Sequence, residues 1–109
     1  MSKIKDFQKD SDVLKALGHP LRLKIIVGLI SHGECNVKLI VEELKIPQST
    51  VSQHLGILKS KEIIESRKEG VKTCYRVVDQ RVYDIIRILE RWIFSLQMSF
   101  YLNYAIEWQ

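Results

Sequence analysis

The chain has 109 residues, of which 46% are hydrophobic and 28% charged, a globular composition rather than a disordered or fibrous one. Its 17 lysines and arginines outnumber its 13 aspartates and glutamates, and the net charge of +4 favours a polyanionic partner. Residues 77–109 contain three basic and four acidic side chains, so the excess positive charge lies before residue 77.

Two cysteines, Cys35 and Cys74, lie far apart and form no close ligand pair, so we expect neither a zinc knuckle nor a disulfide framework. The start of the chain lacks the apolar core of a signal peptide, and the stretch 92–106 is too short for a membrane helix. No paired carboxylates, Ser-His-Asp arrangement or phosphate loop indicates an enzyme. These features favour a cytoplasmic protein without catalytic residues.

The first elements are predicted from residues that break helices and from the helical spacing of apolar residues. A helix should follow Ser11 and end at residues 18–20, because Gly-His-Pro breaks the chain there. A second helix is expected from Leu21 until His32-Gly33 stops its apolar pattern. Asn36 is a good N-cap for a third helix over 37–44, and the break at 45–47 precedes a fourth, which begins near Gln48.

After the fourth helix the spacing of apolar residues changes from helical to that of strands. Residues 63–66 and 73–78 are typical of two strands around a polar turn at 67–72, which predicts a hairpin with a basic tip. Asp79 can cap a last helix, whose apolar stripe runs through Val82 and Ile86 and continues into an aromatic tail. This segment holds seven of the nine aromatic residues, too much apolar surface for one helix to hide, so we expect burial between two subunits.

Together these elements predict one domain over residues 1–109, mainly α with a small β-hairpin wing (α+β), in a winged helix-turn-helix arrangement. Residues 79–109 would form a long dimerisation helix. A helix that opens with small polar residues after a tight turn can enter the DNA major groove, with Gln53 reading a base edge and the wing gripping the backbone. The candidate DNA-binding residues are Gln48, Ser49, Thr50, Ser52, Gln53, His54, Lys59, Arg67, Lys68 and Lys72.

Each of these features alone is more typical of capping residues and a solvated hairpin. Their order along the chain favours double-stranded DNA as the partner. A winged-helix module that binds protein, with an incidental basic wing, stays as the alternative.

Three runs of the sequence, LKALGHPLRLKI at 14–25, PQSTVSQHL at 47–55 and the segment 70–77, resemble the ArsR/SmtB family of bacterial and archaeal regulators. The resemblance covers about residues 11–90. It implies a homodimeric repressor that binds an imperfect inverted repeat, with the first and last helices as the dimer interface. The interface residues we expect are Leu14, Ile85, Leu89, Trp92, Ile93 and Leu96.

Many members of that family bind a metal, but this sequence departs from both of the usual sites. Asn36 and Lys38 stand where one site would have thiolates. At the other site Asp79 matches, whereas Arg81 replaces a histidine and residues 92 and 95 are Trp and Ser. We therefore expect no metal site and no cofactor, although a site built from His19, His32 and Cys35 is conceivable.

The effector would then be a thiol or small-molecule signal, or the regulator would answer to its own abundance. Cys35 and Cys74 are the candidate redox residues, because a helix N-terminus such as that beside Cys35 promotes thiolate chemistry. The simpler interpretation is structural: Cys35 is a small residue beside a cap, and Cys74 packs in the wing or the core.

Overall fold

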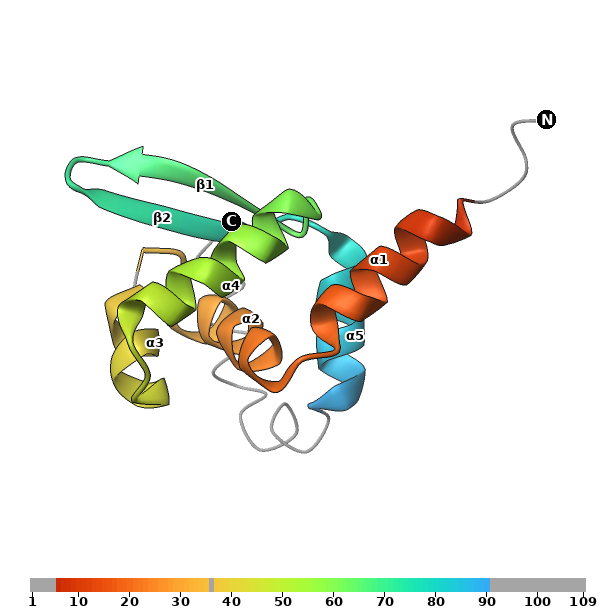
Figure 1. The fold of residues 1–109 in the computed structure, drawn as a ribbon, viewed down its shortest axis with the longest axis horizontal. Helices are drawn as coiled ribbons and strands as arrows, with labels where there is room; N and C mark the ends of the chain where they lie inside the picture. Colours follow the sequence, from red (N-terminus) through yellow and green to blue (C-terminus); the bar gives the residue numbers. More distant parts are fainter. Residues whose placement is uncertain (1–5, 36, 91–109) are drawn as a thin grey trace. The chain divides into compact units, whose positions relative to one another are not determined.

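The structure, a computed structural model, describes residues 6–35 and 37–90 (Figure 1). Four helices come first: α1 (Phe7–Leu17), α2 (Pro20–His32), α3 (Val37–Leu44) and α4 (Gln48–Ser60). The hairpin of β1 (Ile64–Glu69) and β2 (Lys72–Val77) and the helix α5 (Gln80–Leu89) follow. The mainly helical fold with one small antiparallel hairpin agrees with the prediction. The chain divides into two compact units, one ending at Asp79 and one starting with α5.

Helix α1 begins earlier than the sequence pattern predicts. Asp6 caps it, because its carboxylate oxygen Oδ1 accepts from the backbone N–H groups of Gln8 at 3.1 Å and Lys9 at 3.2 Å. Ser11, the expected cap, lies inside the helix. The end at Leu17 is as predicted, since Gly18 and His19 break the helix before Pro20 starts the next one.

Helix α2 is the centre of the first unit and contacts α1, α3, α4 and β2. Its residues Ile25 and Ile26 are completely buried. His19 caps the helix, because its ring nitrogen Nδ1 accepts from the backbone N–H of Leu21 at 3.1 Å. The positions of α1, α3, α4 and β2 are therefore set by what they pack against on α2.

Helix α3 approaches α2 closely at Gly28. A Cβ atom built on Gly28 would lie 2.9 Å from Cγ1 of Ile40, nearer than side-chain atoms pack. Ile40 is buried at this contact, whereas glycine inside a helix costs about 1 kcal/mol relative to alanine. The missing side chain at Gly28 is what lets α3 lie against α2.

The wing is a regular hairpin that is longer, with a shorter turn, than the sequence suggests. Its register pairs Ile64 with Val77 and Glu69 with Lys72, so only Gly70 and Val71 form the turn. Gly70 takes φ +63°, a conformation that glycine adopts without strain and that two-residue hairpin turns require. The basic residues expected in a turn at 67–72 therefore lie on strands.

Helix α5 has one buried face. Val82 and Ile86 are buried on it, whereas Ile88 and Leu89 are 67% and 54% exposed. Helix α5 ends at Leu89. The predicted interface residues Trp92, Ile93 and Leu96 belong to residues 91–109, which lie outside the described part of the chain. None of the described helices is long and apolar enough to cross a membrane.

Cys35 and Cys74 form a disulfide, contrary to the expectation from their spacing. They are 39 residues apart in sequence, yet their Cα atoms are 4.3 Å apart, because β2 folds back beside the turn that precedes α3. Spacing along the chain could not reveal this proximity. Cys74 is buried, as expected for a packing residue, and Cys35 is partly exposed.

We expect reduction of this disulfide to lower the free energy of unfolding by about 4 kcal/mol, because it releases a cross-link across 39 residues of chain. Urea denaturation with and without dithiothreitol measures the difference. The Cys35→Ser variant is the control and should show the same stability in both conditions. A wild-type curve that does not move with reductant would mean that the cross-link contributes nothing.

Candidate nucleic-acid interface

Helix α4 starts abruptly after a tight turn. Lys45, with φ +56°, ends α3, and the carbonyl of Pro47 accepts from the N–H groups of Thr50 at 3.0 Å and Val51 at 3.3 Å. No side chain in the described part of the chain caps the helix at Pro47. The amides of Gln48 and Ser49, which precede these two, are thus left for an external acceptor, as suits a helix N-terminus that meets a phosphate.

The two faces of α4 differ sharply. Val51, Leu55 and Leu58 are buried, and they fix the helix in the core. The other face is exposed and carries most of the predicted contact residues, namely Gln48, Ser49, Ser52, Gln53 and Lys59, while Thr50 is partly buried at the edge. This face is available for the base contacts expected of a recognition helix.

Gly56 belongs to the same exposed face and is not among the residues predicted from the sequence. A Cβ built there meets no atom within 4 Å, so packing does not require glycine at this position. Glycine inside a helix lowers helix stability, so a glycine that packing does not require is unusual. In the sequence, the one local sign of this position is an isolated Gly between Leu55 and Ile57.

His54 lies differently from the other predicted contact residues. Its ring packs on that of His19, with the ring centres 4.7 Å apart, and its Nδ1 is 3.4 Å from Nη1 of Arg22. Arg22 is itself held by the carbonyl oxygens of Ala16 and Lys15. His54 is therefore partly buried against the start of α2, and a contact from it to DNA remains a prediction.

The surroundings of His54 disfavour its charged form. Burial and the neighbouring His19 and Arg22 lower the pKa of His54 below its ordinary value of 6.5. At neutral pH the residue is accordingly uncharged. It contributes shape and a hydrogen-bonding ring to this corner rather than a positive charge for phosphate.

We predict from this lowered pKa that acid weakens the fold. The unfolded chain takes up the proton at His54 more readily than the folded one, so the free energy of unfolding should fall as pH drops below about 6.5. Denaturation curves between pH 5 and 8 measure the slope, which should be shallower in His54→Gln. Equal slopes in the two proteins would contradict the assignment.

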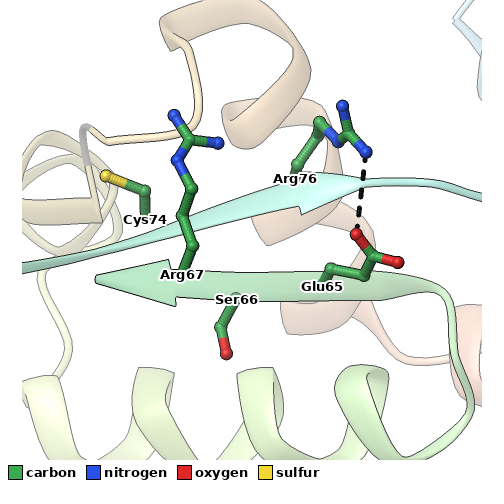
Figure 2. A pocket seen from close by; sticks show the side chains of 5 residues that line it. All are labelled: Glu65, Ser66, Arg67, Cys74 and Arg76. Carbon is green, nitrogen blue, oxygen red and sulfur yellow. Dashed lines mark ion pairs between the residues drawn. The ribbon is translucent and has the colours of Figure 1, made fainter. Parts of the chain in front are cut away.

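The two faces of the wing have different surroundings. Arg67 pairs with Cys74 in the register and Glu65 with Arg76, and Figure 2 shows these four side chains on one face of the hairpin. Ser66 points to the other face, toward α4 (Figure 2). Lys68, two residues further along β1, shares the face of Ser66 because side chains alternate along a strand.

Arg67 is engaged within the protein. Its guanidinium donates to the carboxylates of Glu34 and Glu69, the latter at 2.8 Å. These hydrogen bonds, first that to Glu69 and then that to Glu34, raise the pKa of Arg67. Glu34 is 8% exposed and no sequence signal pointed to it. Lys68 and Lys72 are exposed, so these two are the stronger candidates for backbone contacts.

The three residues of the conceivable metal site have other partners. His19 caps α2, His32 contacts the carboxylate of Glu43 at 3.0 Å, and Cys35 is oxidised. Among the residues that the structure describes, no group of three or more His, Cys, Asp or Glu side chains could hold a metal ion. Asn36 lies outside the described residues, so its predicted capping role is not addressed.

Residues 19–66, which run from the cap of α2 into β1, match the pattern of the bacterial regulatory proteins of the arsR family. The HTH-type transcriptional regulator MJ1325 of Methanocaldococcus jannaschii is 43% identical over 84 residues, which cover 77% of this chain and 94% of that protein. The chain belongs to the arsR family.

Solved structures of a transcriptional repressor and of a DNA-binding domain share the fold. The crystal structure of the transcriptional repressor PagR of Bacillus anthracis matches with a TM-score of 0.69 and 38% identity, covering 77% of this chain and 95% of PagR. The homodimeric winged helix-turn-helix DNA-binding domain of Mb0332 from Mycobacterium bovis matches with a TM-score of 0.67 and 27% identity, over 90% and 95% of the two chains. As an arsR-family member, this chain is a DNA-binding transcriptional regulator.

Proposed function

We propose that this regulator acts in the cytoplasm as a homodimeric repressor that binds an inverted-repeat DNA site. The observation that carries the proposal is the exposed polar face at the start of α4, beside a wing with two exposed lysines. The name of PagR, a repressor 39% identical over 82 residues, supports repression as the direction of control.

The α4 face and the wing divide the work of recognition. Gln53 presents both a donor and an acceptor, the pair of groups that reads an adenine edge in the major groove. Lys68 and Lys72 bring positive charge to the flanking phosphates, which adds affinity without regard to sequence. Arg67, held by two carboxylates, would serve to fix the wing.

Two variants separate these roles. Gln53→Ala should cost about 1–3 kcal/mol on the specific site and relax the preference for its sequence. Lys68→Ala should weaken binding to all duplexes about equally. The slope of log affinity against log salt concentration should become shallower by about one, because one phosphate contact is lost. Fluorescence anisotropy on a duplex selected from a random library, and on a scrambled version of it, makes the comparison.

Equal losses on the two duplexes for Gln53→Ala would remove Gln53 from base readout. Wild-type protein that binds neither duplex at low salt would instead support the reading of the fold as a protein-interaction module. Sequence-specific regulators typically bind their site with an affinity at least about 10³-fold higher than their affinity for a scrambled duplex.

The proposed dimer would use exposed leucines of the first and last helices. Leu14 on α1 is 59% exposed, and on α5 Leu89 is exposed beside Ile88, whereas the predicted interface residue Ile85 is partly buried. Large side chains of this kind, left in water on both helices, favour burial by a second subunit. Mb0332, whose DNA-binding domain is homodimeric, supports a dimer as the assembly of this chain.

We expect Leu14→Glu and Leu89→Glu to shift the protein toward monomer in sedimentation at micromolar concentration, because each places a charge in an apolar interface. Leu39→Glu is the matched control, since Leu39 is an exposed leucine on α3. Its sedimentation should stay that of the wild type. A wild-type monomer at micromolar concentration would refute the dimer.

A further inference from the structure

Three contacts attach the wing to the turn that precedes α3. The Cys35–Cys74 disulfide is one, and the backbone N–H of Tyr75 donates to the carbonyl of Glu34 at 2.8 Å. The third is the ion pair between Arg67 and the Glu34 carboxylate. All three join residues 34–35 to adjacent residues of the hairpin, and the disulfide is the only covalent link among them.

We propose that Cys35 and Cys74 are a reversible oxidation site through which a hydroperoxide controls how firmly the wing grips DNA. The disulfide form holds the wing to the body of the regulator and has the higher DNA affinity. The dithiol form has a looser wing and binds more weakly. This inference rests on the DNA-binding function proposed above.

Oxidation should raise, not lower, the affinity for DNA, because it restricts the conformational freedom of the wing before binding. A two-stranded hairpin is marginally stable by itself, and the outer part of this one, from Arg67 to Lys72, is exposed on both strands. A regulator whose wing is already fixed loses less conformational freedom when Lys68 and Lys72 meet phosphates. Oxidation supplies that fixation in advance.

The exposure of the two sulfur-bearing residues gives the order of the chemical steps. Cys35 is partly exposed, whereas Cys74 is 1% exposed, so the hydroperoxide meets Cys35 first. The Cys35 thiolate attacks the peroxide, the O–O bond breaks, and an alcohol or water leaves while Cys35 becomes a sulfenic acid. The Cys74 thiol then attacks that sulfur, the S–S bond forms as the S–O bond breaks, and the hydroxyl leaves as water with the thiol proton.

The return step needs a dithiol reductant, which is oxidised to its own disulfide as the two cysteines are reduced. Arg67 lies opposite Cys74 on the same face of the hairpin (Figure 2), but its charge is already paired with Glu34 and Glu69. Arg67 therefore brings no unopposed positive charge to Cys74. The closeness of the two cysteines, with Cα atoms 4.3 Å apart, is what favours their pairing.

The experiment compares the full chain after hydrogen peroxide and after dithiothreitol. Free thiols are counted by alkylation and mass spectrometry, and affinity is measured by anisotropy on the selected and scrambled duplexes. We expect peroxide to remove both thiols and to tighten binding about fivefold on both duplexes, since the wing contacts phosphate rather than bases. Cys35→Ser and Cys74→Ser should bind like the reduced wild type in either condition.

Two further variants locate the effect. Lys68→Ala should lose most of the gain on oxidation, because that gain acts through the wing, whereas Lys59→Ala on α4 should keep it. Since the wild type is tested in both redox states, the result stands even if a serine variant folds poorly.

Thiols that both remain free after peroxide would overturn the inference. So would oxidised and reduced proteins whose affinities agree within about twofold, or tighter binding by the reduced form. In each of these cases a retained preference for the selected duplex leaves the proposed function intact. Loss of that preference in both redox states would instead defeat the proposed function itself.

Discussion

The contact between Gly28 of α2 and Ile40 of α3 is the constraint on which the proposed DNA-binding surface depends. Because glycine leaves room there, α3 lies directly on the central helix, and a turn of three residues then fixes where α4 can begin. The buried residues Val51, Leu55 and Leu58 hold α4 on the same core. The exposed face of α4 is thereby presented by a rigid base rather than by a loop.

Unlike α4, which apolar packing holds in place, the outer part of the wing is held by polar contacts and a disulfide. Apolar residues at its base are buried, but the part that would reach DNA is attached through the buried Glu34, whose carbonyl and carboxylate bind Tyr75 and Arg67. Glu34 lies in the turn before α3, so one short segment joins the helix-turn-helix to the hairpin. The outer part of the wing is thus attached to the helix-turn-helix through polar and covalent links, which are easier to alter than a packed core.

Much of this fold could be predicted from the sequence, because the signals were local. Gly18 to Pro20, His32-Gly33 and the break at 45–47 set the bounds of α2, α3 and α4 as expected, and the hairpin was recognised from its change of period. The start of α1 was wrong, since Asp6 and Ser11 are both good caps and only the structure distinguishes them. The wing turn was predicted too long, because charged residues occupy exposed strands as readily as turns.

The site was predicted less completely, for reasons that involve distance along the chain. Gln53 and its neighbours lie on the exposed face that helical spacing indicated, and residues 14–25 and 47–55 carried the family resemblance that the comparisons confirm. The partners of His54 and Arg67 come from other elements, so no local pattern reveals them. The disulfide was missed for the same reason.

The open surroundings of Gly56 bear on how such a regulator changes its target. Because no neighbouring atom limits a side chain at this position, and Ser49, Ser52 and Gln53 are likewise exposed, these positions can vary without disturbing the core. Selection for a new operator would meet little resistance from folding on this face, and a residue other than glycine would even favour the helix. Duplicated copies of the gene could therefore diverge in DNA preference through single substitutions while keeping one scaffold.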